Sequence, residues 1–229
     1  MNNEQAIPEA KRTWRELDRT ERRVAGVLVE KSKTTQDNYP MTLNSITTAC
    51  NQKSNRYPLM NLSPEEVQKA LDRLRQCRAV MEVHGDGRVP KYKHLLYEWL
   101  GVEKLELAVM AELLLRGQQT LGDLRARASR MDEIASQDEL RPVVDGLIRK
   151  DLIVELTPPG RGQMVTHNLY HFEELKKVRL QVASELATSE EPKSESPGEA
   201  NSLASRVESL EAKLAEALVR IEQLESALR

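Results

Sequence analysis

Residues Ser63-Pro64-Glu65-Glu66-Val67 begin a pattern that recurs about 73 residues later, from Ser136. In both copies a serine is followed three residues later by a glutamate, which is the signature of a capping box at the start of a helix. Apolar residues then recur every three to four positions, and two short segments follow on either side of a polar turn. The turn is Gly85-Asp86-Gly87 in the first copy and Pro158 to Gly162 in the second. Each copy is therefore predicted to be a capped helix followed by a β-hairpin.

Two further helices are predicted before each of these units. In the first copy, Asp18 and Glu21 form a second capping box that predicts a helix to about Lys31, and Thr42 to Cys50 is a short amphipathic helix. In the second copy the three helices are expected over Glu103–Arg116, Thr120–Ser129 and Gln137–Lys150. Three helices followed by a hairpin are typical of a winged helix-turn-helix domain, so the sequence predicts two of them in tandem.

The fold class expected is α+β, mainly helical, with two tandem winged helix-turn-helix domains, a flexible linker and a C-terminal coiled-coil helix. The predicted parts are an N-terminal tail over 1–16, domain 1 over 17–100, domain 2 over 101–172, a helix over 173–186, a disordered linker over 187–200 and a coiled coil over 201–229.

Composition places the protein among water-soluble intracellular chains. No apolar run approaches the roughly 20 residues that a membrane helix requires, and the first ten residues are too polar for a signal peptide. We therefore expect a cytoplasmic protein without a membrane partner. Its two cysteines, Cys50 and Cys77, lack the spacing of a metal or redox motif and are expected to be reduced thiols in the core.

The charge is unevenly distributed along the chain. Residues 1–100 carry 17 Lys and Arg against 13 Asp and Glu, whereas residues 101–186 carry 12 against 14 and residues 187–229 carry 5 against 9. A polyanion such as DNA is therefore expected to meet the first domain.

Candidate nucleic-acid contacts lie in three places in that domain. The hairpin offers phosphate-binding cations, the exposed face of the third helix offers side chains to a groove, and the polar turn from Asn51 to Arg56 offers further donors. The candidate residues are Lys53, Arg56, Lys69, Arg73, Arg88, Lys91 and Lys93. Alternation along the returning strand predicts Lys91 and Lys93 on one face, with Tyr92 and His94 on the other. The alternative is that all these cations belong to an ordinary solvated surface.

Part of this domain resembles a known family. The strings Tyr39-Pro40-Met41-Thr42-Leu43-Asn44, Ala49-Cys50-Asn51-Gln52-Lys53-Ser54-Asn55-Arg56 and Pro58-Leu59-Met60-Asn61-Leu62 closely resemble the YceH-like family of bacterial proteins. The resemblance covers roughly residues 17–172 and implies two winged-helix domains in a bacterial cytoplasm. It implies no activity, because the family is essentially uncharacterised. The chain departs from the family pattern at Gln36 and at Tyr57.

The second copy is less suited to a phosphate backbone, since its hairpin turn keeps one cation, Arg161. We expect it to pack against, or to bind, another protein surface. His94 and His167 occupy matching positions in the two hairpins, and without further ligands at regular spacing they are expected to be hydrogen-bonded structural histidines and not metal ligands.

The last segment has the heptad spacing of a coiled coil. The a and d positions are Leu203, Val207, Leu210, Leu214, Ala217, Ile221, Leu224 and Leu228. A parallel pair would match Arg206 with Glu211 and Arg220 with Glu225, so we expect a parallel homodimer, with a trimer as the lesser alternative. With about four heptads, an amphipathic helix folded back on the body or bound to another protein is the other interpretation.

The chain contains no phosphate loop, nucleophile elbow, zinc-protease or dinucleotide-binding motif. We therefore expect a non-enzymatic protein without a cofactor or metal. The leading hypothesis is a DNA-binding regulator or architectural protein that uses the third helix and basic hairpin of domain 1. The alternative is a scaffold whose winged helices bind protein and not DNA.

Overall fold

The first helix of the chain begins at the capping box that the sequence predicts. In the computed structural model, which describes residues 14–84 and 89–189, α1 spans Arg19–Thr34. The Asp18 carboxylate accepts a hydrogen bond from the Glu21 amide, and the Glu21 carboxylate accepts one from the Asp18 amide, both at 2.8 Å. These two bonds satisfy amide donors that a helix start leaves without partners.

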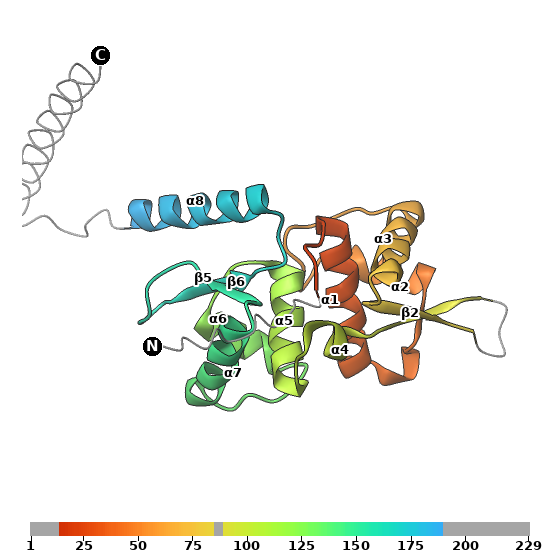
Figure 1. The fold of residues 1–229 in the computed structure, drawn as a ribbon, viewed down its shortest axis with the longest axis horizontal. Helices are drawn as coiled ribbons and strands as arrows, with labels where there is room; N and C mark the ends of the chain where they lie inside the picture. The colour runs from red at the N-terminus through yellow and green to blue at the C-terminus, as the bar shows by residue number, and fades with distance from the viewer. Residues whose placement is uncertain (1–13, 85–88, 190–229) are drawn as a thin grey trace, which may run out of the picture. The chain divides into compact units, whose positions relative to one another are not determined.

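The first repeat continues from α1 through a set of short elements (Figure 1). They are η1 (Gln36–Asn38), β1 (Met41–Thr42), α2 (Leu43–Cys50), α3 (Pro64–Gln76), β2 (Val80–Val83), β3 (Lys91–His94) and α4 (Leu96–Leu100). Ser63 and Glu66 form the predicted capping box of α3. The three strands form an antiparallel sheet in the order β1-β3-β2.

The second repeat uses the same order of elements. They are α5 (Lys104–Arg116), β4 (Gln119–Thr120), α6 (Leu121–Ala128), α7 (Gln137–Arg149), β5 (Ile153–Glu155) and β6 (Met164–His167). Their sheet has the order β4-β6-β5, which is the order of the first sheet shifted by three strands. Each repeat is thus helix, strand, helix, helix and two hairpin strands, and the protein is α+β and mainly helical.

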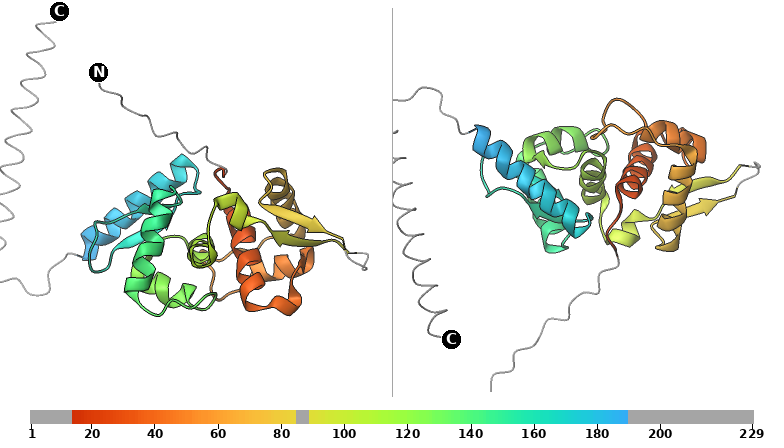
Figure 2. Two further views of the ribbon diagram at one scale, coloured as in Figure 1. Left: turned by 60° about the horizontal axis from the view of Figure 1, so that its bottom comes forward. Right: turned by 90° about the horizontal axis from the view of Figure 1, so that it is seen from above.

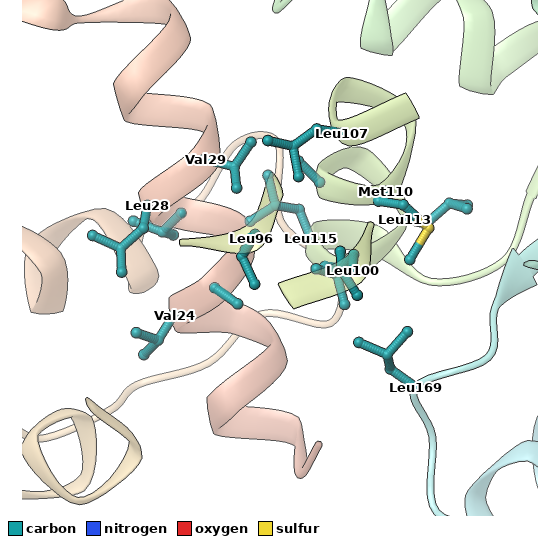
Figure 3. Close-up of a cluster of buried hydrophobic side chains, with 14 of the residues drawn as sticks. Val24, Leu28, Val29, Leu96, Leu100, Leu107, Met110, Leu113, Leu115 and Leu169 are labelled. Atoms are coloured by element: carbon teal, nitrogen blue, oxygen red, sulfur yellow. The ribbon is translucent and has the colours of Figure 1, made fainter. Parts of the chain in front are cut away.

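The two repeats meet along α1 and α5, which lie side by side in the middle of the molecule (Figures 1 and 2). Gly26 of α1 makes this approach close, since a Cβ atom there would lie 2.9 Å from Cγ of Leu115 on α5. Leucines of α4 and α5 extend the apolar cluster from α1 to Leu169 beyond β6 (Figure 3). One hydrophobic core therefore runs through both repeats, and Cys50, a free thiol, lies within it.

The two ends of this body differ from the sequence-based expectation. Trp14 is buried and the Leu17 amide donates to the Leu169 carbonyl at 2.9 Å, so the tail predicted over 1–16 does not include the residues from Trp14 onward. At the other end α8 spans Phe172–Ser189 and passes the predicted limits of 173 and 186. Most of the predicted linker and the whole predicted coiled coil lie outside the described residues.

None of the helices in the described ranges, 14–84 and 89–189, has the length and apolar content needed to cross a bilayer.

Candidate functional site

Two of the candidate cations lie in the turn between α2 and α3, and they differ in their exposure to solvent. Lys53 is exposed, but Arg56 is buried. The Arg56 guanidinium donates to both carboxylate oxygens of Glu30, at 2.6 and 3.1 Å, and to the carbonyl of Ala49 at 3.0 Å. The interpretation of Arg56 as a nucleic-acid contact is therefore wrong, because its donors face inward and bind the end of α2 to α1.

The candidates on α3 also differ from one another. Lys69 is exposed, and no ion pair joins it to another described residue. Arg73 reaches back to the start of α1, where its guanidinium lies 2.9 Å from the carboxylate of Asp18 and 3.6 Å from that of Glu21. Reading a base would require Arg73 to release both carboxylates, so Lys69 is the freer of the two cations on α3.

One face of the first hairpin packs toward α3. The Tyr92 hydroxyl donates to Gln68 at 3.3 Å, and Arg75 forms an ion pair with Glu82 at 2.7 Å. In the antiparallel register Glu82 lies opposite Tyr92, so both belong to this inner face. Arg75 is thus a further cation of α3 whose charge is neutralised inside the repeat.

The other face of the hairpin carries the predicted lysines. Lys91 pairs with Val83 and Lys93 with Met81 in the register, while Tyr92 between them is buried. The prediction that the two lysines share a face opposite Tyr92 is confirmed. Lys91 is exposed and Lys93 partly so, and neither forms an ion pair with another described residue. Arg88, the candidate at the turn, lies outside the described residues.

A groove of about 870 Å³ lies between the end of α3 and β2. Its charged lining alternates in sign, with Asp72 and Glu82 beside Arg75 and Arg78. Such a lining does not favour a polyanion over another polar surface.

The hairpin of the second repeat is held by polar contacts to its own helix. Arg141 of α7 donates to Gln163 at 2.6 Å, and Gln163 donates to Glu155 at 2.5 Å. Arg161 in the turn is exposed. This surface therefore offers phosphate fewer free cations than the first hairpin.

The two matching histidines are held in the same way. The Nδ1 atom of His94 accepts from the Leu96 amide at 3.4 Å, and that of His167 accepts from the Leu169 amide at 3.2 Å. Burial lowers the pKa of His94 to about 4 and that of His167 well below its ordinary value. Both are neutral, hydrogen-bonded structural residues, as the sequence predicts. In the described ranges no three His, Cys, Asp or Glu side chains are grouped to hold a metal ion.

Sequence reasoning missed a cluster of arginines where the two repeats meet. Arg19, Arg22 and Arg23 of α1 and Arg116 of α5 line a pocket of about 330 Å³. The spacing of the first three, at i, i+3 and i+4 on one helix, was the available signal, but their shared pocket depends on how α5 packs against α1.

Comparison with known proteins establishes the family. A model described as "Protein of unknown function, DUF480" matches residues 17–163. The chain belongs to this family. It is 47% identical over 205 residues to a UPF0502 protein of Rhodopirellula baltica, an alignment that covers 87% of this chain and 86% of the relative.

Other relatives extend this similarity. A UPF0502 protein of Saccharophagus degradans is 40% identical over 216 residues, which is 91% of this chain and 96% of the relative. A UPF0502 protein of Geobacter sulfurreducens is 49% identical over 143 residues, covering 62% and 63%. The predicted resemblance to an uncharacterised bacterial family is thereby confirmed.

Proposed function

We propose that each repeat is a winged helix-turn-helix module and that the first binds the phosphate backbone of DNA as a non-enzymatic, architectural contact. The order of helix, strand, helix, helix and hairpin in both repeats, with the first strand added beside the last, supports this interpretation. Fold alone does not define a ligand, so the argument depends on the charged side chains.

The observation that carries the proposal is a division among the cations of the turn before α3, of α3 itself and of the described part of the first hairpin. Internal carboxylates hold three arginines of the first repeat, Arg56, Arg73 and Arg75. Four lysines have no such partner among the described residues: Lys53, Lys69, Lys91 and Lys93. A lysine is a compact, mobile point charge that suits phosphate, whereas arginine supplies the planar fork for reading guanine.

This division favours binding that is independent of sequence. Phosphate contacts supply affinity and position a protein on the duplex, but they carry no direct base information. Glu65 and Glu66, both exposed in the first turn of α3, would also oppose deep entry of that end of the helix into a groove. The proposed contact is therefore with the backbone, as in an architectural protein, and not with an operator.

The test is a titration of the full chain with a short random-sequence duplex at several salt concentrations between about 50 and 200 mM. Log affinity should fall linearly with log salt, by about 0.9 units for each phosphate neutralised. A variant with Lys53, Lys69, Lys91 and Lys93 changed to alanine should lose up to about 3 to 4 units of that slope.

The matched control removes four exposed cations outside the first repeat, namely Arg149, Arg161, Lys176 and Lys177, also by change to alanine. This control changes the net charge by the same amount as the four-lysine variant, and it should keep most of the dependence of log affinity on log salt. Absence of binding by the unaltered chain at low salt, or equal loss in the two variants, would refute the proposed surface.

Dimerisation through residues 201–229, which lie outside the described residues, is part of the same proposal. A parallel coiled coil would place two DNA-binding repeats on one duplex and raise avidity without any new contact. Sedimentation should give the mass of a dimer for the full chain and of a monomer after removal of 201–229. An unchanged mass would reject the coiled coil while leaving the lysine surface to its own test.

A protein-binding scaffold is the second candidate, and one observation favours it. Tyr57 and Leu59, in the turn before α3, are 58% and 62% exposed. Large apolar side chains exposed together are typical of a protein-binding surface. A photo-crosslinker at Leu59 should capture a discrete partner in the native cell, while one at exposed Arg161 should not; equal labelling at both positions would contradict the scaffold.

A further inference from the structure

The pocket of about 330 Å³ where the repeats meet has the size of a small-molecule site. Its walls come from the start of α1, the turn before α3, the end of α5 and the segment from β6 into α8. Tyr57, Met60 and Leu114 supply apolar surface, and the four arginines named above supply positive charge. A single carboxylate, that of Glu174, lines the same space.

Arg23 is the unusual residue of this pocket. It is 2% exposed, and its two terminal nitrogens donate to main-chain carbonyls, Nη1 to Cys50 at 2.9 Å and Nη2 to Pro58 at 2.7 Å. Its Nε atom is buried and has no hydrogen-bond partner among the described residues. Buried charged groups are normally paired, because removing a charge from water without compensation is costly.

The other charges of the pocket do not compensate Arg23. Glu174 is used by Arg22, which donates to both of its oxygens at 2.8 Å. Arg116 is 2.9 Å from the carboxylate of Glu112 on its own helix. Arg19 is exposed and forms no ion pair with another described residue. Arg19 and Arg23 therefore leave an excess of positive charge in the pocket.

The opposite end of α1 shows what a compensated arrangement looks like. There Lys33 lies over the ring of Tyr97, as Arg22 lies over the ring of Tyr170 beside the pocket. The side chain of Lys33 is buried, and it forms an ion pair with Asp132, whose carboxylate is also buried. The cation at that end is thus matched by the protein itself, in contrast to Arg23.

The position of the arginines on α1 points in the same direction. Arg19, Arg22 and Arg23 lie in the first two turns and are neighbours at i+3 and i+4, a spacing at which like charges repel. The start of a helix favours anions and disfavours cations. An anion between these side chains would relieve both effects.

We propose that this pocket binds a small organic anion, a carboxylate or phosphate monoester with an apolar body. Arg19 provides the oxyanion contact, the uncompensated charge of Arg23 in the pocket wall adds attraction, and Tyr57, Met60 and Leu114 cover the apolar part. Because the walls come from both repeats, the bound anion stabilises their packing against each other. The site is separate from the lysine surface and does not depend on DNA binding.

The test titrates the full chain with benzoate, phenyl phosphate, inorganic phosphate and neutral benzamide at constant ionic strength. Binding is followed by NMR of ¹³C-labelled methionine methyl groups. The methyl signal of Met60, which lines the pocket, should shift with benzoate or phenyl phosphate, whereas that of exposed Met81 on β2 should not. Tighter binding of benzoate or of phenyl phosphate identifies carboxylate or phosphate as the favoured group. The difference in affinity between phenyl phosphate and inorganic phosphate measures the contribution of the apolar part of the ligand.

The variant for this test is Arg19→Ala, since Arg19 is exposed and its loss spares the folded core. Loss of one charge-assisted contact should weaken probe binding about tenfold. Arg161→Ala, which removes an exposed cation outside the pocket, is the control and should bind as the unaltered chain does.

Three results would overturn the inference. The first is that the Met60 signal does not shift with any anion up to about 10 mM, a concentration beyond the range of specific metabolite affinity. The second is that benzamide binds as tightly as benzoate. The third is that Arg19→Ala binds the probes with unchanged affinity.

Discussion

Lys53 and Arg56 are three residues apart in one polar turn, yet the fold uses them in opposite ways. Lys53 faces solvent, and Arg56 is enclosed by Glu30, Ala49, Gln52 and its own neighbour Asn55. The sequence does not distinguish them, because both are cations in a hydrophilic string. The difference arises from Glu30, 26 residues earlier on α1, whose carboxylate lies within reach once α1 packs against α2.

Arg56→Ala is expected to lower the free energy of unfolding by about 3 to 5 kcal/mol, because it leaves the Glu30 carboxylate buried with its main partner gone. Urea unfolding followed by circular dichroism measures the change. Lys53→Ala in the same turn should stay within about 0.5 kcal/mol of the unaltered chain. Similar losses in both variants would show that the turn as a whole, and not the buried ion pair, is responsible.

Among the elements, those with local signals were predictable from the sequence. The caps at Asp18, Ser63 and Ser136 place the starts of α1, α3 and α7 at the expected residues, since each depends on a hydrogen bond within four positions. The strands β1 and β4 were missed. Each has two residues and is formed by pairing with a hairpin strand far along the chain, as Met41 does with Tyr92.

The candidate site follows the same rule. Alternation within β3 predicts the shared face of Lys91 and Lys93, because a strand determines its own two faces. The neutralisation of Arg73 by Asp18 depends on packing between α3 and α1, and no pattern within α3 indicates it. The helix α4, five residues long, was also missed; its buried Leu96 and Trp99 face the core that α1 and α5 create.

The two histidines at the ends of the hairpins lead to a prediction about how the stability of the fold depends on pH. His167 is buried, His94 is half-buried, and both are neutral; burial is the main cause of their lowered pKa values, followed by the charges of Arg22 and Lys33 respectively. Below the ordinary histidine pKa of about 6.5 the unfolded chain takes up protons that the folded chain does not, so stability falls as pH falls. For His94 this loss continues until about pH 4, where the folded residue titrates.

When the pH is lowered from 7.5 to 5.5, each of the two histidines should reduce the free energy of unfolding by about 1.4 kcal/mol. Urea titrations at the two pH values measure the sum. In His94→Asn and in His167→Asn, the difference between the two pH values should shrink by about half, whatever the stability at pH 7.5. A difference unaffected by both substitutions would assign the pH dependence to other groups.

At the scale of the whole molecule, the two repeats share their core and should unfold together. Gly26→Ala tests this, because the added methyl group would meet buried Leu115 at 2.9 Å and the Ala111 carbonyl at 3.3 Å. Alanine favours a helix over glycine by about 1 kcal/mol, but overpacking a core costs about 1 to 3 kcal/mol, so a net loss of about 1 kcal/mol is expected.

Gly122→Ala in α6 is the control, since the nearest atom to an added Cβ there is 3.7 Å away and the helix should gain stability. Unfolding should be followed both by far-ultraviolet circular dichroism and by the fluorescence of Trp14 and Trp99. In Gly26→Ala the two transitions should move together to lower urea concentration. Two separated transitions would show that the repeats unfold as independent domains.

The hydrogen bond from Leu17 to Leu169 has a consequence for how this protein is made. A ribosome adds about 5 to 20 residues each second, so roughly 8 to 30 seconds pass between synthesis of these two residues. During that interval the nascent chain holds the start of α1 without the segment that accepts the Leu17 amide and receives the Arg22 side chain. The start of α1 is thus among the last parts of the folded body to reach its final contacts, and a chaperone that protects this helix during synthesis would act while those contacts are missing.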